Sequence, residues 1–164
     1  HSDGATIAAI YAGTVHDPRL RGLVTIAPHF FTEEIGLTEI ARAKQAFESG
    51  NLRSRLAKYH RDPDNCFRGW NDAWLHPEFK EWNVSDVLDE ISVPVLAIQG
   101  QEDQYGTLAQ IDEIERRCPK PTRRVVLPDC GHDPCYEQPD RVLTELTRFC
   151  ADVEPDVVRP GAGS

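Results

Sequence analysis

The 164-residue sequence lacks any apolar run that approaches the length needed to span a membrane. It also lacks a positively charged segment followed by an apolar stretch, which is the pattern of a secretion signal. Basic residues are few. The sequence contains 18 Lys and Arg but 27 Asp and Glu, so its net charge is −9. We therefore expect neither nucleic acid nor a membrane surface as a partner. We expect a small molecule as the partner and the cytoplasm as the location.

Paired cysteine motifs are also missing. The five cysteines are odd in number and scattered, which predicts reduced thiols: Cys66, Cys118, Cys130, Cys135 and Cys150. Cys130, His132 and Cys135 could be interpreted as metal ligands, but zinc sites usually have a second ligand pair elsewhere, and none is present. We expect no metal and no cofactor.

Short apolar strands alternate with helices along most of the chain. Buried strands are predicted over Leu23–Ala27, Val93–Gln99 and Val125–Leu127, and helices are predicted before, between and after them. Strands that are apolar throughout indicate a parallel sheet covered on both faces, so the fold class is α/β. A chain of this length is normally one domain.

Three chemically different side chains follow the ends of strands. Ser2 begins the first helix, Asp103 follows the second strand, and His132 follows the third. Reactive groups gather at the carboxyl ends of parallel strands. A serine needs a base to accept its proton, and the base needs a carboxylate to orient it. Each residue could alone be a helix cap, but the three together predict a catalytic triad, with Glu102 as the alternative acid.

The motifs around these residues resemble those of serine hydrolases with the α/β-hydrolase fold. HSDG supplies the serine and last glycine of the G-x-S-x-G nucleophile elbow. SVPVLAIQGQEDQYG resembles the family's strand and acid loop, and LPDCGHDPCYEQPDRVLTELTRF its histidine loop and final helix. The resemblance implies Ser2 as nucleophile, Asp103 as acid, His132 as base, and the backbone N–H of Asp3 as an oxyanion donor.

The resemblance also divides the chain. Residues 1–28 and 84–152 would form the hydrolase core, residues 29–83 a helical cap, and residues 153–164 a flexible tail. In the family the cap covers the active site. Phe30, Phe31, Trp70 and Trp74 are the candidates for the substrate pocket, although aromatic residues of a cap also form its own core.

A serine at the nucleophile position implies an acyl-enzyme and substrates such as esters, lactones, thioesters or cleavable diketones. Two alternatives stay open at this point. One is a hydrolase-fold protein that binds a ligand without catalysis, and the other is an acyltransferase or C–C hydrolase that uses the same triad.

The family's strands before the elbow are not present in the sequence. Their absence would leave the strand over Leu23–Ala27 with an open edge and would remove the second oxyanion donor. We therefore expect the sequence to be the C-terminal part of a longer enzyme and, as an isolated chain, to be unstable, inactive or aggregated.

Overall fold

The computed structural model describes residues 1–153. The tail predicted from residue 153 onward therefore lies, apart from Val153, outside the described residues. The helices, 3-10 helices and strands in chain order are α1 (Asp3–Thr14), β1 (Leu23–Ile26), α2 (Glu34–Ser49), α3 (Leu52–Leu56), α4 (Pro63–Trp74), η1 (Pro77–Glu81), η2 (Ser85–Glu90), β2 (Val95–Gly100), α5 (Ala109–Arg117), β3 (Thr122–Leu127), α6 (Pro134–Glu137) and α7 (Pro139–Val153).

The three strands form one parallel sheet in the order β1-β2-β3. Leu23 of β1 is level with Val95 of β2, and Val95 is level with Thr122 of β3. The central strand β2 is buried along its whole length, which explains why its sequence is an almost continuous apolar run. The predicted α/β class with a parallel sheet is confirmed.

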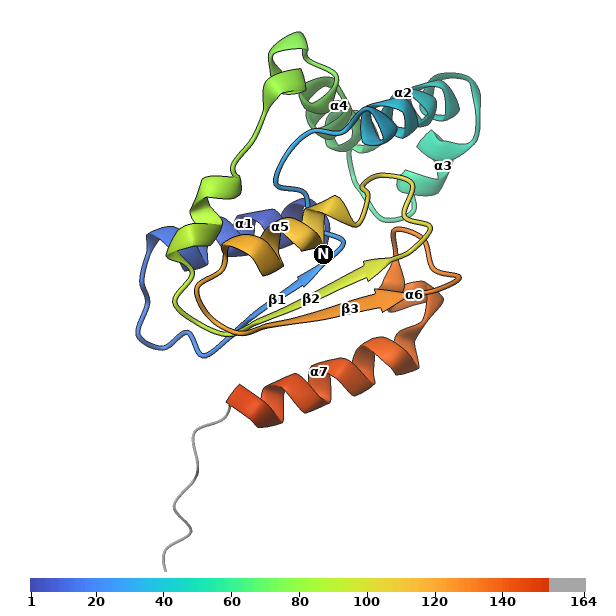
Figure 1. The fold of residues 1–164 in the computed structure, drawn as a ribbon. Helices are drawn as coiled ribbons and strands as arrows, with labels where there is room; N and C mark the ends of the chain where they lie inside the picture. Colours follow the sequence, from blue (N-terminus) through green and yellow to red (C-terminus); the bar gives the residue numbers. More distant parts are fainter. Residues whose placement is uncertain (154–164) are drawn as a thin grey trace, which may run out of the picture.

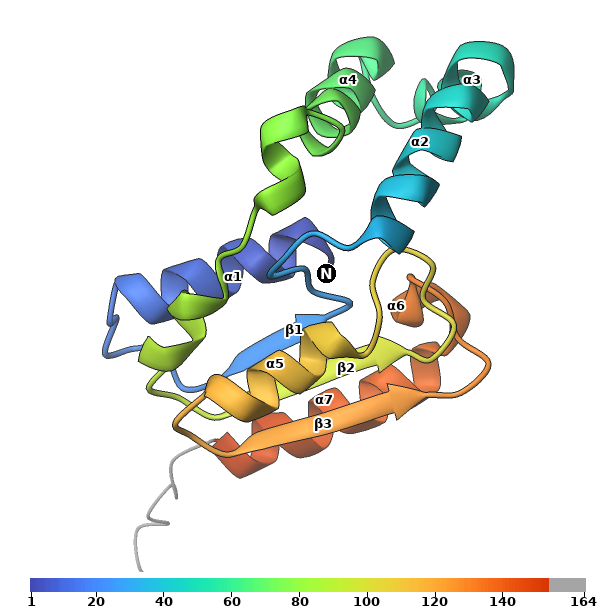
Figure 2. The same cartoon turned by 45° about the horizontal axis from the view of Figure 1, so that its top comes forward.

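Helices cover both faces of the sheet, as Figures 1 and 2 show. On one face, α1, α5 and η2 pack over a core that includes Ala9, Leu23, Leu88, Val95 and Ile111. On the other face, α7 packs over a second cluster made of side chains from the three strands, the loop after β3 and α7 itself: Ile26, Leu96, Ile98, Leu127, Cys130, Val142 and Phe149. The small side chains at one face of α1 allow its close approach to the sheet.

Strand boundaries differ from the predicted ones by one to three residues. β1 ends at Ile26, because Ala27 has a positive φ of 47° that leaves the extended region. β2 begins at Val95, directly after Pro94, which has no N–H to donate to a ladder. β3 begins at Thr122, earlier than the apolar run alone indicated, because its first half is only partly buried and carries two arginines.

Helices α2, α3 and α4 form a layer that stands off the sheet on the side of α1 and α5 (Figures 1 and 2). The chain enters and leaves this layer through two segments that pair with each other. Phe31 bridges Asn83, the N–H of Thr32 donates to Trp82, and the N–H of Val84 donates to Phe30. The helical layer is therefore closed at its base by backbone hydrogen bonds.

Candidate active site

Ser2 lies at a sharp turn where the chain enters α1. Its backbone has φ 52° and ψ −132°, a region that residues other than glycine rarely adopt. The N–H of Ser2 donates to the carbonyl of Ile26 at 2.9 Å, which attaches the turn to the end of β1. The turn thereby holds the serine side chain above the carboxyl end of the sheet. A Cβ added at Gly4, the glycine of the HSDG motif, would meet no described atom of another part of the chain within 4 Å.

His132 joins Ser2 to Asp103 through its two ring nitrogens. Nε2 of His132 lies 3.0 Å from Oγ of Ser2, and Nδ1 lies 2.9 Å from both carboxylate oxygens of Asp103. A carboxylate only accepts, so Nδ1 carries the proton and Nε2 is left to accept from the Ser2 hydroxyl. The structure therefore brings the three side chains together in the order that serine chemistry requires.

Asp103 is buried, with 6% of its surface exposed, and its carboxylate is held from several sides. It accepts hydrogen bonds from the side chain of Gln99 at 2.9 Å and from the N–H of Tyr105 at 2.8 Å. These contacts orient the oxygens that face His132. Glu102, the alternative acid, turns elsewhere and accepts from the N–H of Cys130 at 2.7 Å.

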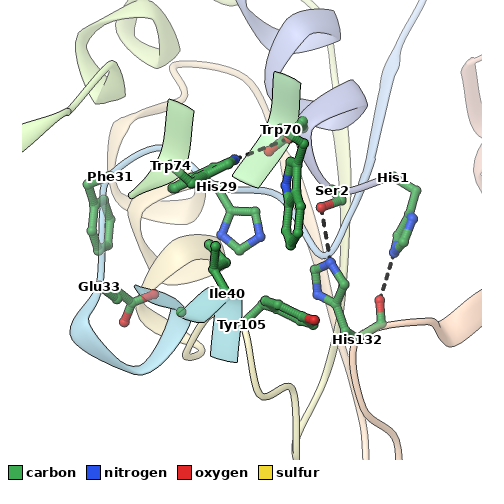
Figure 3. Close-up of a pocket in the computed structure, with 12 residues that line it drawn as sticks. His1, Ser2, His29, Phe31, Glu33, Ile40, Trp70, Trp74, Tyr105 and His132 are labelled. Atoms are coloured by element: carbon green, nitrogen blue, oxygen red, sulfur yellow. Dashed lines mark hydrogen bonds between the residues drawn. The ribbon is translucent and has the colours of Figure 1, made fainter. Parts of the chain in front are cut away.

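A cavity of about 270 Å³ opens beside Ser2 and His132 (Figure 3). Three of the four aromatic residues suggested for the pocket line it, namely Phe31, Trp70 and Trp74. The prediction for Phe30 was wrong. Phe30 is fully buried in the core beneath α1 and α5 and does not line the cavity. The N–H of Phe30 donates to the buried side chain of Gln110, and the carbonyl of His29 accepts from Thr6, so this segment is fixed with Phe30 in the core and with His29 and Phe31 at the cavity.

The structure adds several residues to the cavity that sequence reasoning missed: His1, His29, Glu33, Gly36, Ile40 and Tyr105. The ring of Tyr105 lies 4.8 Å from that of His132, and burial raises the pKa of its hydroxyl. Nε2 of His1 donates to the backbone carbonyl of His132 at 2.7 Å. Tyr105 follows Asp103 by two positions, and His29 follows the end of β1, so their place at strand ends was the available signal.

The backbone N–H of Asp3 lies in the first turn of α1. N–H groups at this position have no partner within the helix and face outward at its positive end. Asp3 lines the cavity next to Ser2, and its side chain accepts from Nε1 of Trp74 at 3.3 Å. The side chain is thus turned toward the helical layer, and the N–H is left for another acceptor.

Within residues 1–153, no three His, Cys, Asp or Glu side chains are grouped so that they could hold a metal ion. All five cysteines are free thiols, and burial raises the pKa of Cys130 to about 11, so this thiol stays protonated.

None of the described helices has the length and apolar character needed to cross a membrane.

A parallel sheet with a serine at the sharp turn into α1, an aspartate in the loop after β2 and a histidine in the loop after β3 is arranged as in the α/β-hydrolase class. The family model of the alpha/beta hydrolase family matches residues 1–145. The chain belongs to that family.

Solved structures support the fold. A thermophilic esterase from Thermogutta terrifontis is 22% identical and is matched over 94% of this chain and 64% of its own, with a TM-score of 0.60. The esterase RhEst1 from Rhodococcus sp. ECU1013 is 15% identical over 93% and 64%, with a TM-score of 0.65. The enol-lactonase from Burkholderia xenovorans LB400 is 20% identical over 92% and 63%, with a TM-score of 0.61.

The lengths of these proteins differ from that of this chain. The chain spans 56 to 66% of the first solved structures that it matches. A search of curated proteins found no match.

Proposed function

We propose that this chain carries the nucleophile, base and acid of a serine hydrolase that acts on a small carboxylic ester, lactone or related carbonyl compound. The observation that carries the proposal is the continuous contact from Ser2 Oγ through His132 to the buried carboxylate of Asp103, beside a cavity. The similarity to esterases and an enol-lactonase agrees with this chemistry.

In the proposed reaction, Oγ of Ser2 attacks the substrate carbonyl while Nε2 of His132 takes its proton. The N–H of Asp3 donates to the oxyanion that forms, and Asp103 stabilises the imidazolium. His132 then gives the proton to the departing alcohol, which leaves an ester on Ser2. Water, deprotonated by His132, attacks this ester, and collapse of the second intermediate releases the acid and returns the proton to Ser2.

The helical layer above the cavity has a proposed role as well. Residues 29–83 contribute more than half of the residues that line the cavity, including Phe31, Trp70 and Trp74. We propose that this segment acts as a cap that determines the shape of the substrate pocket and shields the acyl-enzyme from bulk water.

The test uses a fluorophosphonate probe on the protein expressed from its complete gene, with the labelled residue found by mass spectrometry. Labelling is expected on Ser2 and is expected to disappear in His132→Ala. Ser54→Ala, which removes a surface hydroxyl of α3, serves as the matched control and should keep the label. A folded protein that takes no label on Ser2 would overturn the proposal.

A further inference from the structure

His29 is held in place by the helix that begins at the serine. Oγ1 of Thr6, one turn into α1, donates to the carbonyl of His29 at 2.5 Å, and the N–H of His29 donates back to the same oxygen at 3.3 Å. Thr6 is itself buried. The backbone of His29 therefore keeps a constant position relative to Ser2.

The ring of His29 is confined on several sides. It meets Trp74 edge-on with ring centres 5.5 Å apart and lies at the same distance from the ring of His132. Against a third side lies Gly106, where an added Cβ would come within 3.1 Å of Cε1 of His29. Figure 3 shows the ring between Trp74 and His132 at the cavity wall.

The ring nitrogens of His29 are unused within the described chain. Only 7% of the residue is exposed, and among residues 1–153 no side chain or backbone group forms a hydrogen bond with either nitrogen. A neutral imidazole offers one donor and one acceptor, and neither ring nitrogen of His29 belongs to the buried unpaired polar atoms of the described residues, so both reach open space where a hydrogen-bond partner can bind. Because His29 lines the cavity beside Ser2, a ligand in that cavity can supply the missing partner.

The charge around the cavity restricts what that ligand can be. Of the described lining residues none is Lys or Arg, whereas Asp3 and Glu33 contribute carboxylates. Burial, and next the charge of the neighbouring His132, lower the pKa of His29, so its ring is neutral at neutral pH. A carboxylate on the substrate would find no fixed positive charge on these walls to balance it.

The rest of the wall is aromatic. Phe31, Trp70, Trp74 and Tyr105 surround the space that His29 faces, and Ile40 adds an aliphatic side chain. Such walls bury apolar parts of a ligand, and isolated polar groups among them set its orientation. The rings of His29, Trp70 and Tyr105 all carry a polar atom without a hydrogen-bond partner among the described residues, and His29 is the most buried of the three.

We propose that His29 is a specificity-determining residue that hydrogen-bonds an uncharged oxygen of the substrate, a hydroxyl or a ketone, close to the ester that Ser2 attacks. The inference rests on the proposed hydrolase function and adds its substrate class: neutral oxygen-bearing esters are favoured over plain hydrocarbon esters and over esters that carry a carboxylate.

The test compares matched esters. Methyl butyrate, methyl 3-hydroxybutyrate and monomethyl succinate place an apolar, a neutral polar and an anionic group on the acyl side. Butyl acetate and 3-hydroxybutyl acetate make the same comparison on the alcohol side. In at least one series kcat/KM is expected to be about fivefold higher for the hydroxylated ester, the effect of one hydrogen bond. Monomethyl succinate is expected to be the poorest acyl-side substrate.

Substitution of His29 separates binding from packing. His29→Phe should remove the preference for the hydroxylated ester, measured as the ratio of kcat/KM for the hydroxylated and the apolar ester within the same variant, because a phenyl ring offers no hydrogen-bonding nitrogen. His29→Gln keeps a donor and an acceptor and should therefore retain part of the preference. If His29→Phe does not fold, the preference of His29→Gln for the hydroxylated ester is compared with that of the unsubstituted protein instead. His60→Phe, on the exposed surface of the helical layer, is the matched control.

Two failures are distinguishable. If the fluorophosphonate probe labels Ser2 but the hydroxyl preference is absent, or is equal in the unsubstituted protein and both His29 variants, the inference is wrong and the hydrolase function stands. Preference for monomethyl succinate would also overturn it. If Ser2 takes no label in the folded protein, the proposed function fails and the inference fails with it.

Discussion

Gly100, the last residue of β2, lies directly against the backbone of Gly131. A Cβ added to Gly100 would be 2.1 Å from the carbonyl oxygen of Gly131 and 2.3 Å from that of Cys130. Neither glycine has a positive φ, so the requirement is for space. Asp103 follows Gly100 by three positions and His132 follows Gly131 directly, so this backbone contact sets the distance between the proposed acid and base.

Gly100→Ala is therefore expected to force the two loops apart. The overpacking should lower the free energy of unfolding by about 1–3 kcal/mol. Ester turnover should fall by more than this loss of stability explains, because His132 would lose its contact with Asp103. Urea denaturation and kcat/KM measured together check this. Gly69→Ala, in the interior of α4 where an added Cβ meets nothing within 4 Å, should instead stabilise by about 0.5–1 kcal/mol. Equal effects of the two substitutions would contradict the steric argument.

The choice between Asp103 and Glu102 can be tested by two amide substitutions. Asp103→Asn should lower kcat by about 10⁴-fold, as the same change does in other triads, because an amide donor facing Nδ1 favours the wrong tautomer of His132. Glu102→Gln keeps an oxygen that can accept from the N–H of Cys130 and should change kcat by no more than a few-fold. Turnover of p-nitrophenyl acetate is the measurement, and the reverse ranking would identify Glu102 as the acid.

Gln110 connects the segment after β1 to α5. It is fully buried, accepts from the N–H of Phe30 at 2.7 Å, and donates to the carbonyl of Phe31 at 3.0 Å and to the carboxylate of Glu33 at 2.6 Å. Gln110→Leu should destabilise by about 1–3 kcal/mol, because buried groups lose their partners. It should also raise KM, since Phe31 lines the cavity.

A matched change on the surface of α2 is the control for that prediction. Gln45→Leu alters an exposed glutamine and should shift the free energy of unfolding by no more than about 0.5 kcal/mol. Chemical denaturation of both variants, together with KM for one ester, provides the comparison. An unchanged KM in a folded Gln110→Leu protein would show that the segment holding Phe31 does not depend on this network.

The burial of His29 should make the free energy of unfolding fall at acidic pH. Its pKa in the folded protein is lowered, mainly by burial and then by His132, while the charges of Asp3, Asp103 and Glu33 oppose the shift. The unfolded chain therefore binds a proton on His29 near its ordinary pKa of about 6.5 while the folded protein does not. Stability attributable to this residue is present above that pH and is lost as the pH falls through it, by at most about 1.4 kcal/mol per pH unit.

The measurement is the free energy of unfolding at pH 7.5 and at pH 5.5. His29→Phe should lose less stability between these values than the unsubstituted protein, and His60→Phe should behave like the unsubstituted protein. If His29→Phe has the same pH dependence as the unsubstituted protein, the ring of His29 is protonated in the folded state.

The sequence by itself was sufficient for the three strands to within three residues, for the fold class and for the order of the candidate site residues. Side-chain periodicity is a local property: the continuous apolar run of β2 and the amphipathic pattern of α7 depend on residues close together in the chain. The positions of Ser2, Asp103 and His132 after strands were visible for the same reason. Their hydrolase roles stay a prediction until the labelling and substitution experiments are done.

Only the tertiary structure decided which neighbours face the cavity. His29, Phe30 and Phe31 are adjacent in sequence, yet the middle one is buried in the core and the outer two line the cavity. That outcome depends on Thr6 and Gln110, which lie 23 and 80 positions away from their partners His29 and Phe30. Hydrogen bonds of such sequence separation form only after the sheet and its covering helices have packed, so no local pattern could indicate them.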